Sequence, residues 1–81
     1  MGNPRPKTAR LAEKLLAVRQ RLDISQLKMA QCLELEGSAY HRISEYEKGR
    51  REPHLAILLR YARAANVSVE CLIDDEMDLP L

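Results

Sequence analysis

Apolar residues recur at steps of three and four along most of this 81-residue chain, and this period is the feature that most restricts its fold. Leu11, Leu15, Val18 and Leu22 follow one another in this way, which predicts a helix over about residues 8–22. Because the sequence contains neither Phe nor Trp, its core must consist mainly of Leu, Ile, Val, Ala and Met. The chain is therefore expected to be all-α.

The same spacing predicts four further helices, over about residues 26–34, 39–48, 54–65 and 69–74. Ser25, Ser38 and Ser68 directly precede three of them, where a hydroxyl oxygen can accept from a free backbone N–H group. Gly49 and Asn66 stand where a helix end takes up left-handed backbone. Five short helices in so few residues predict a compact bundle with one core.

The shorter helices also carry apolar faces that should point inward. The residues expected in the core are Leu27, Met29, Ala30, Leu33, Ile43, Tyr46, Leu55, Leu58, Tyr61, Ala62, Ala65 and Leu72. Cys32 and Cys71 fall within these patterns and are expected to be reduced, buried thiols. Together with His41 and His54 they lack the close ligand spacing of a zinc site, so no metal is expected.

Charge is distributed unevenly along the chain. All 13 Lys and Arg residues precede Asn66, whereas residues 70–81 contain five of the 12 acidic residues. Residues 1–69 thus hold 13 basic against 7 acidic residues, a net charge of +6. This pattern predicts a phosphate-facing body, with a flexible arm over 1–7, a helical domain over 8–74 and an acidic tail over 75–81.

Several classes of function lack their usual motifs in this sequence. No apolar run approaches a membrane span, and residues 1–10 are polar, which favours a cytoplasmic protein without a membrane partner. No Gly-rich phosphate loop or nucleophile-base arrangement occurs. Neither an enzyme nor a cofactor is therefore expected.

The helices predicted over 26–34 and 39–48 are joined by a short turn containing Gly37, which is free to take a positive φ. The second helix carries polar residues outward, and a basic loop follows it over residues 50–53. This geometry fits a DNA major groove. A helical protein-interaction module has the same pattern, so spacing alone leaves both functions open.

Blocks of residues over about 8–74 then narrow the choice. They are Ser25-Gln26, Met29-Ala30, Leu33, Ile43-Ser44-x-Tyr46-Glu47-x-Gly49-x-x-x-Pro53, and Ala62 through Val67-Ser68-Val69 with Leu72. In order and spacing they resemble the phage repressor/Cro-type helix-turn-helix family of small transcriptional regulators. The resemblance implies a lambda-repressor-like domain whose second and third helices form the helix-turn-helix. The link from Leu33 to Ile43 is about three residues longer than in that family, near residues 34–37.

The resemblance also implies a role for individual side chains. Base edges would be contacted by Tyr40, His41, Arg42 and Glu45, and phosphates by Gln26, Ser44, Lys48, Arg50 and Arg51. The longer turn affects Tyr40 more than the other three base-contacting residues. Arg19 and Glu47 occupy the positions of a structural ion pair.

One recognition helix covers few base pairs, so the expected partner is double-stranded DNA bound by a homodimer on a palindromic operator. Leu79 and Leu81, or the last helix, are candidates for the dimer interface. The alternative is an adaptor or antitoxin-like module whose acidic residues 70–78 bind a basic protein partner, with incidental DNA contact.

Overall fold

The computed structural model describes residues 9–35, 37 and 40–80, which form five helices and contain no strand. The helices are α1 (Leu11–Leu22), α2 (Gln26–Cys32), α3 (Tyr40–Glu47), α4 (Leu55–Ala65) and α5 (Val69–Ile73). The prediction of an all-helical chain is confirmed for these residues. The expected start of the first helix at residue 8 is wrong, because residues 9–10 form a turn.

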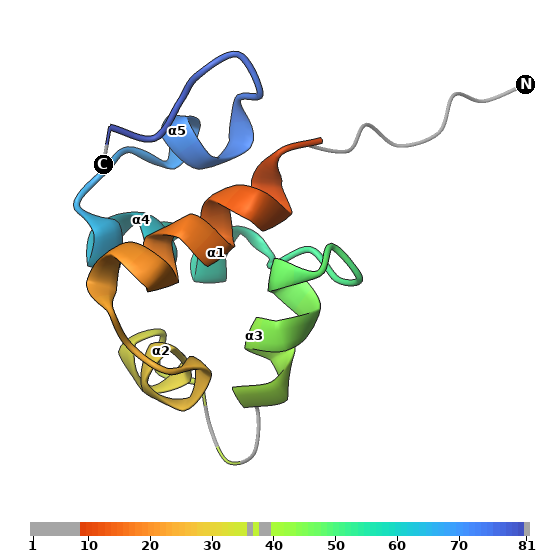
Figure 1. The fold of residues 1–81 in the computed structure, drawn as a ribbon, viewed down its shortest axis with the longest axis vertical. Helices are drawn as coiled ribbons and strands as arrows, with labels where there is room; N and C mark the ends of the chain where they lie inside the picture. The colour runs from red at the N-terminus through yellow and green to blue at the C-terminus, as the bar shows by residue number, and fades with distance from the viewer. Residues whose placement is uncertain (1–8, 36, 38–39, 81) are drawn as a thin grey trace, which may run out of the picture.

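Helix α1 crosses the middle of the molecule, with α5 on one side of it and α2 and α3 on the other (Figure 1). It packs against α3, α4 and α5, while α2 packs chiefly against α3. The α2–α3 pair is thus attached to the rest of the molecule mainly through α1.

The core draws apolar side chains from all five helices. The buried ones are Leu11, Leu15, Val18, Met29, Ala30, Leu33, Ile43, Tyr46, Ile57, Leu58, Tyr61, Ala62, Cys71 and Leu72. Tyr46 and Tyr61 pack edge to face with ring centroids 6.5 Å apart, as aromatic pairs prefer. Most of the side chains that the spacing placed in the core are therefore confirmed there.

Three of the predicted core residues are instead exposed: Leu27, Cys32 and Leu55. At 100° per residue, Leu27 and Cys32 each lie about 110° from the buried face of α2, on opposite sides of it. Leu55, at the first position of α4, lies about 90° from the buried face of that helix and is 78% exposed. The inward faces of α2 and α4 are too narrow to cover these positions.

The helix ends follow the predicted chemistry at most positions. Ser25 Oγ accepts from the backbone N–H of Lys28 at 3.0 Å, and Gly49 and Asn66 take positive φ angles of 74° and 58°. Ser68 forms no capping hydrogen bond, so that prediction is wrong; its hydroxyl lies 3.3 Å from the Sγ atom of Cys71 instead. The predicted cap at 38 lies outside the described residues.

The turn after α2 begins earlier than predicted. Glu34 takes a left-handed conformation with φ 58°, which ends α2 at Cys32 rather than at residue 34. Gly37 has φ 63°, as its place in the turn predicted. Leu35 is partly buried against the core, and its backbone N–H donates to the carbonyl oxygen of Ala30. The turn is therefore held at its start by a local hydrogen bond and an apolar contact.

The segment after α5 folds back onto the start of α1. The carboxylate of Asp75 accepts from the backbone N–H groups of Ala9 and Arg10 at 2.8 and 3.0 Å. Both N–H groups directly precede α1, whose start has no side-chain cap of its own, so Asp75 joins this end of the helix to the segment after α5. The hydrogen bonds from these N–H groups lower the pKa of Asp75. The guanidinium of Arg10 also contacts Asp78 Oδ1 at 2.7 Å.

Lys14 is buried, with only 3% of its surface exposed. Its ammonium group donates to the carbonyl oxygens of Cys71, Asp74 and Met77 at 2.7–2.8 Å. All three donors of the ammonium are thus satisfied. Lys14 therefore fixes the end of α5 and the segment after it against α1.

No helix among the described residues combines the length and apolar character needed to cross a membrane.

Candidate nucleic-acid interface

Helix α3 has one buried and one solvent-facing side. Ile43 and Tyr46 are 0% and 4% exposed, which turns the opposite side of the helix outward. Tyr40, His41 and Arg42 are exposed, with His41 at the centre of that outward side and Tyr40 and Arg42 at its two edges, and the side chains of Ser44 and Glu45 are half-buried. The rings of Tyr40 and His41 lie edge to face with centroids 6.3 Å apart. The outward side therefore carries hydrogen-bonding groups.

Three cations follow the end of α3. Lys48, Arg50 and Arg51 are exposed, and the left-handed Gly49 turns the chain between them. The backbone N–H of Arg50 donates to the carbonyl oxygen of Glu45 at 2.9 Å, so the first part of this loop is held against the helix. The cations thus lie beside the outward face of α3.

Glu45 lies within this group of cations. Its carboxylate is 3.9 Å from Nε of Arg51, and the Arg51 and Glu45 side chains are 52% and 36% exposed. Exposed pairs of this length contribute little stability, so Glu45 can exchange this partner for another.

An ion pair joins α1 to the end of α3. Glu47 accepts from Nε and Nη2 of Arg19 at 2.6 and 3.0 Å, and its side chain is only 6% exposed. The same guanidinium donates to the carbonyl oxygen of Ile24 at 3.0 Å. The hydrogen bonds to Glu47 raise the pKa of Arg19. The pair that the sequence suggested is therefore present and connects three segments.

Gln26 also belongs to this arrangement. Its Nε2 donates to Oε1 of Glu47 at 3.2 Å, so its amide is held between the start of α2 and the end of α3. This contact uses one of the two amide hydrogens. The other hydrogen and the amide oxygen have no partner among the described residues.

Tyr61 lies beneath the ion pair. It is fully buried, and among the described residues its hydroxyl has no hydrogen-bond partner. Burial is the main cause that raises its pKa, with the negative charge of Glu47 adding to it. The Tyr61 phenol is therefore neutral at physiological pH and serves packing.

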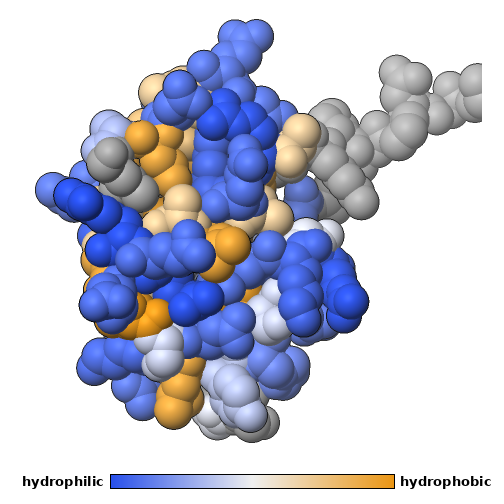
Figure 2. All heavy atoms as spheres, viewed as in Figure 1, coloured by the Kyte–Doolittle hydropathy of each residue, from blue (hydrophilic) through white to orange (hydrophobic). Residues whose placement is uncertain are grey.

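The acidic segment after α5 and the basic loop after α3 lie on different sides of α1. Asp75 and Asp78 belong to the segment after α5, whereas Arg50 and Arg51 follow α3, below α1 in Figure 1. Figure 2 shows hydrophilic side chains over most of the same face of the molecule, with hydrophobic ones in separate patches. The acidic segment after α5 and the cations after α3 are thus apart in space, while Arg10 and Lys14 contact the acidic segment directly.

Comparison of the chain with protein-family models, with curated proteins and with solved structures gave no match. The site must therefore be interpreted from its own chemistry. Within the described residues, no three His, Cys, Asp or Glu side chains are grouped so that they could hold a metal ion.

The proposed side chains lie on α3, on the loop after it and at the start of α2, and contacts join Gln26 to Glu47 and Arg51 to Glu45. Sequence analysis missed two features: the contacts of Lys14 and Asp75, and a cleft lined by Arg60 and Arg63. Both depend on segments distant in sequence, and helical spacing contains no signal for either.

Proposed function

We propose that this protein binds double-stranded DNA with sequence specificity and acts as a small transcriptional regulator. The observation that carries the proposal is the exposed polar side of α3 beside the exposed cations Lys48, Arg50 and Arg51. A single helix fits the major groove, and cations beside it neutralise the phosphates at the groove's edge. The sequence resemblance to repressor/Cro-type helix-turn-helix regulators supports the same assignment.

In this proposal the phosphate contacts come from the loop after α3, from Ser44 and from Gln26. Arg50 and Arg51 provide charge with a planar hydrogen-bonding fork, and Lys48 provides a mobile point charge. Gln26 contributes the amide hydrogen that Glu47 does not use. These contacts position α3 without selecting a sequence.

Sequence selection is assigned to the outward side chains of α3. Arg42 would donate two hydrogen bonds to O6 and N7 of guanine, the most common specific contact in the major groove. Glu45 would accept from N4 of cytosine after leaving its 3.9 Å contact with Arg51. Tyr40 and His41 complete the base-contacting set.

The Arg19–Glu47 ion pair has a positioning role in this proposal. Because it links α1, α3 and Gln26, it fixes the angle of α3 relative to the rest of the protein. A recognition helix must keep its orientation for its side chains to meet particular bases.

We further propose that two copies bind a palindromic operator with their recognition helices about 34–36 Å apart. Of the suggested interface residues, Leu79 is partly buried against the core, and residue 81 lies outside the described part of the chain. On α5, Ile73 remains 39% exposed and is the better candidate for the contact.

The acidic segment gives little support to the adaptor alternative. Asp75 and Asp78 already contact Ala9 and Arg10, so a basic partner would have to displace these contacts. The proposed function therefore places recognition on α3 rather than on this segment.

Selection from a random pool of duplex DNA at near-physiological salt tests the proposal. An enriched inverted repeat, with sedimentation of the complex as two protein copies per duplex, is the expected result. A pool that stays unenriched after repeated rounds would remove sequence-specific DNA binding from consideration. A single enriched half-site bound by one copy would retain specific binding and remove the dimer.

A further inference from the structure

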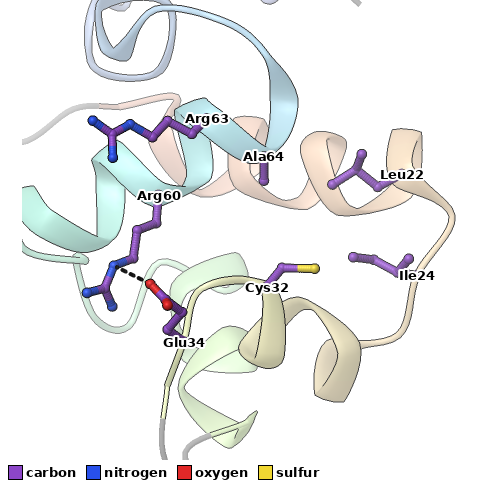
Figure 3. Close-up of a pocket in the computed structure, with 7 residues that line it drawn as sticks. All are labelled: Leu22, Ile24, Cys32, Glu34, Arg60, Arg63 and Ala64. Carbon is purple, nitrogen blue, oxygen red and sulfur yellow. Dashed lines mark ion pairs between the residues drawn. The ribbon is translucent and has the colours of Figure 1, made fainter.

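A cleft of about 660 Å³ lies between the end of α1, the end of α2 and α4, separate from the outward face of α3 (Figure 3). Four of its lining side chains are apolar: Leu22, Ile24, Cys32 and Ala64. Figure 3 shows them gathered at one end of the cleft, with the sulfur of Cys32 directed toward Ile24. The volume lies within the range of small-molecule sites.

Charged side chains lie at the other end. Arg60 donates to the carbonyl oxygen of Leu33 at 2.8 Å and lies 3.7 Å from the carboxylate of Glu34, so its position is fixed. Arg63 is exposed and has no hydrogen-bond or ion-pair partner among the described residues. Both guanidinium groups project from α4 away from Leu22 (Figure 3). Two cations against one anion leave this end with a net charge of +1.

We propose that this cleft binds a small amphiphilic monocarboxylate, with its hydrocarbon body at the apolar end and its carboxylate at Arg63. The guanidinium of Arg63 matches a carboxylate in shape and charge. A neutral apolar molecule would leave this guanidinium without a partner. A dianion would meet the carboxylate of Glu34. The proposal does not depend on DNA binding, because none of the residues assigned to DNA contact lines the cleft.

The chain contains its own reporter of occupancy. Cys32 is exposed and lines the cleft, whereas Cys71 is buried. A ligand on the apolar end should therefore slow alkylation of Cys32 by N-ethylmaleimide, a neutral reagent. Titration with hexanoate, octanoate and decanoate below their micelle concentrations, followed by this rate and by amide chemical shifts, measures affinity. Each added methylene should tighten binding about fourfold.

Two variants with the same change in net charge distinguish a specific contact with the carboxylate from general electrostatic attraction of the anion. Arg63→Glu should weaken octanoate binding about tenfold and leave the weaker binding of octanol unchanged. Arg50→Glu makes the same change in net charge outside the cleft and should alter octanoate binding less than about twofold. Ala64→Leu should fill the apolar end and abolish the dependence on chain length. Circular dichroism and urea midpoints show that each variant is folded.

Three results would overturn the proposal. They are no protection of Cys32 at millimolar octanoate, equal affinity for octanol and octanoate, or equal losses in the Arg63 and Arg50 variants. The two arginine variants decide the matter even where Ala64→Leu fails to fold.

Discussion

Removal of the Glu47 carboxylate should be among the most damaging single changes in this protein. Glu47→Ala removes three hydrogen bonds, two from Arg19 and one from Gln26. It also leaves Arg19, whose side chain is only 19% exposed, without a counterion. Breaking a buried pair from one side costs about 3–5 kcal/mol, and the partial exposure of Arg19 places the expected loss at about 2–4 kcal/mol.

That loss is large relative to the stability of a chain of this size. At about 0.05–0.15 kcal/mol per residue, 81 residues provide about 4–12 kcal/mol. The melting temperature should fall by at least about 8 °C. Urea unfolding followed by far-UV circular dichroism measures the free energy, and Gln26→Ala serves as a milder control with a loss of about 1 kcal/mol.

A double variant separates the charge from the loss of packing. Arg19→Met with Glu47→Met removes both charges while keeping apolar volume, so its stability should lie within about 1 kcal/mol of wild type. A loss below about 1 kcal/mol for Glu47→Ala, or a double variant that is as unstable as the single one, would refute the reasoning.

Three further predictions concern other parts of the molecule. Tyr61→Phe removes a buried hydroxyl without a partner among the described residues and should leave stability unchanged or raise it by about 1 kcal/mol in urea unfolding; a loss above about 1 kcal/mol contradicts it. The lowered pKa of Asp75 means that its contribution is complete above its ordinary pKa of about 3.9 and disappears as pH falls through its folded value. Asp75→Asn should therefore be less stable than wild type at pH 7, with a gap that closes at acid pH; a gap independent of pH would exclude the carboxylate as its source. Arg50→Ala with Arg51→Ala should reduce the slope of log affinity against log salt for duplex DNA by about 2, and an unchanged slope would remove both residues from the phosphate contacts.

The parts of the fold that depend on local period could be predicted from the sequence. Leu15, Val18 and Tyr46 lie at core spacing and are buried, and Gly49 and Asn66 take the left-handed conformations expected at helix ends. These properties follow from neighbours within about two turns, which helical periodicity samples directly.

Other features depend on partners that are distant in the sequence. In the sequence, Lys14 cannot be distinguished from a solvated lysine. Its burial depends on the carbonyl oxygens of Cys71, Asp74 and Met77, which surround its ammonium group only in the folded structure. Leu55 satisfied the apolar spacing of α4, yet no other helix covers the edge on which it lies. The apolar spacing within one helix does not predict how wide a face of that helix its neighbours will bury.

The candidate interface was predicted only in part. Of the proposed base-contacting residues, His41 and Glu45 lie on the outward side of α3 and Tyr40 and Arg42 at its edges, because Ile43 and Tyr46 define the inward side. The contact of Glu45 with Arg51 was not predicted, because it depends on how the chain turns at Gly49.

Titration of the selected duplex and a scrambled duplex with wild type and Arg42→Ala tests the role of α3 most directly. Wild type should bind the selected sequence at least about a thousandfold more tightly than scrambled DNA. Arg42→Ala should lose about 1–3 kcal/mol on the selected sequence, with relaxed preference at one guanine and unchanged affinity for scrambled DNA. Equal affinities of wild type for both duplexes, or an equal loss on both in the variant, would contradict sequence recognition by α3.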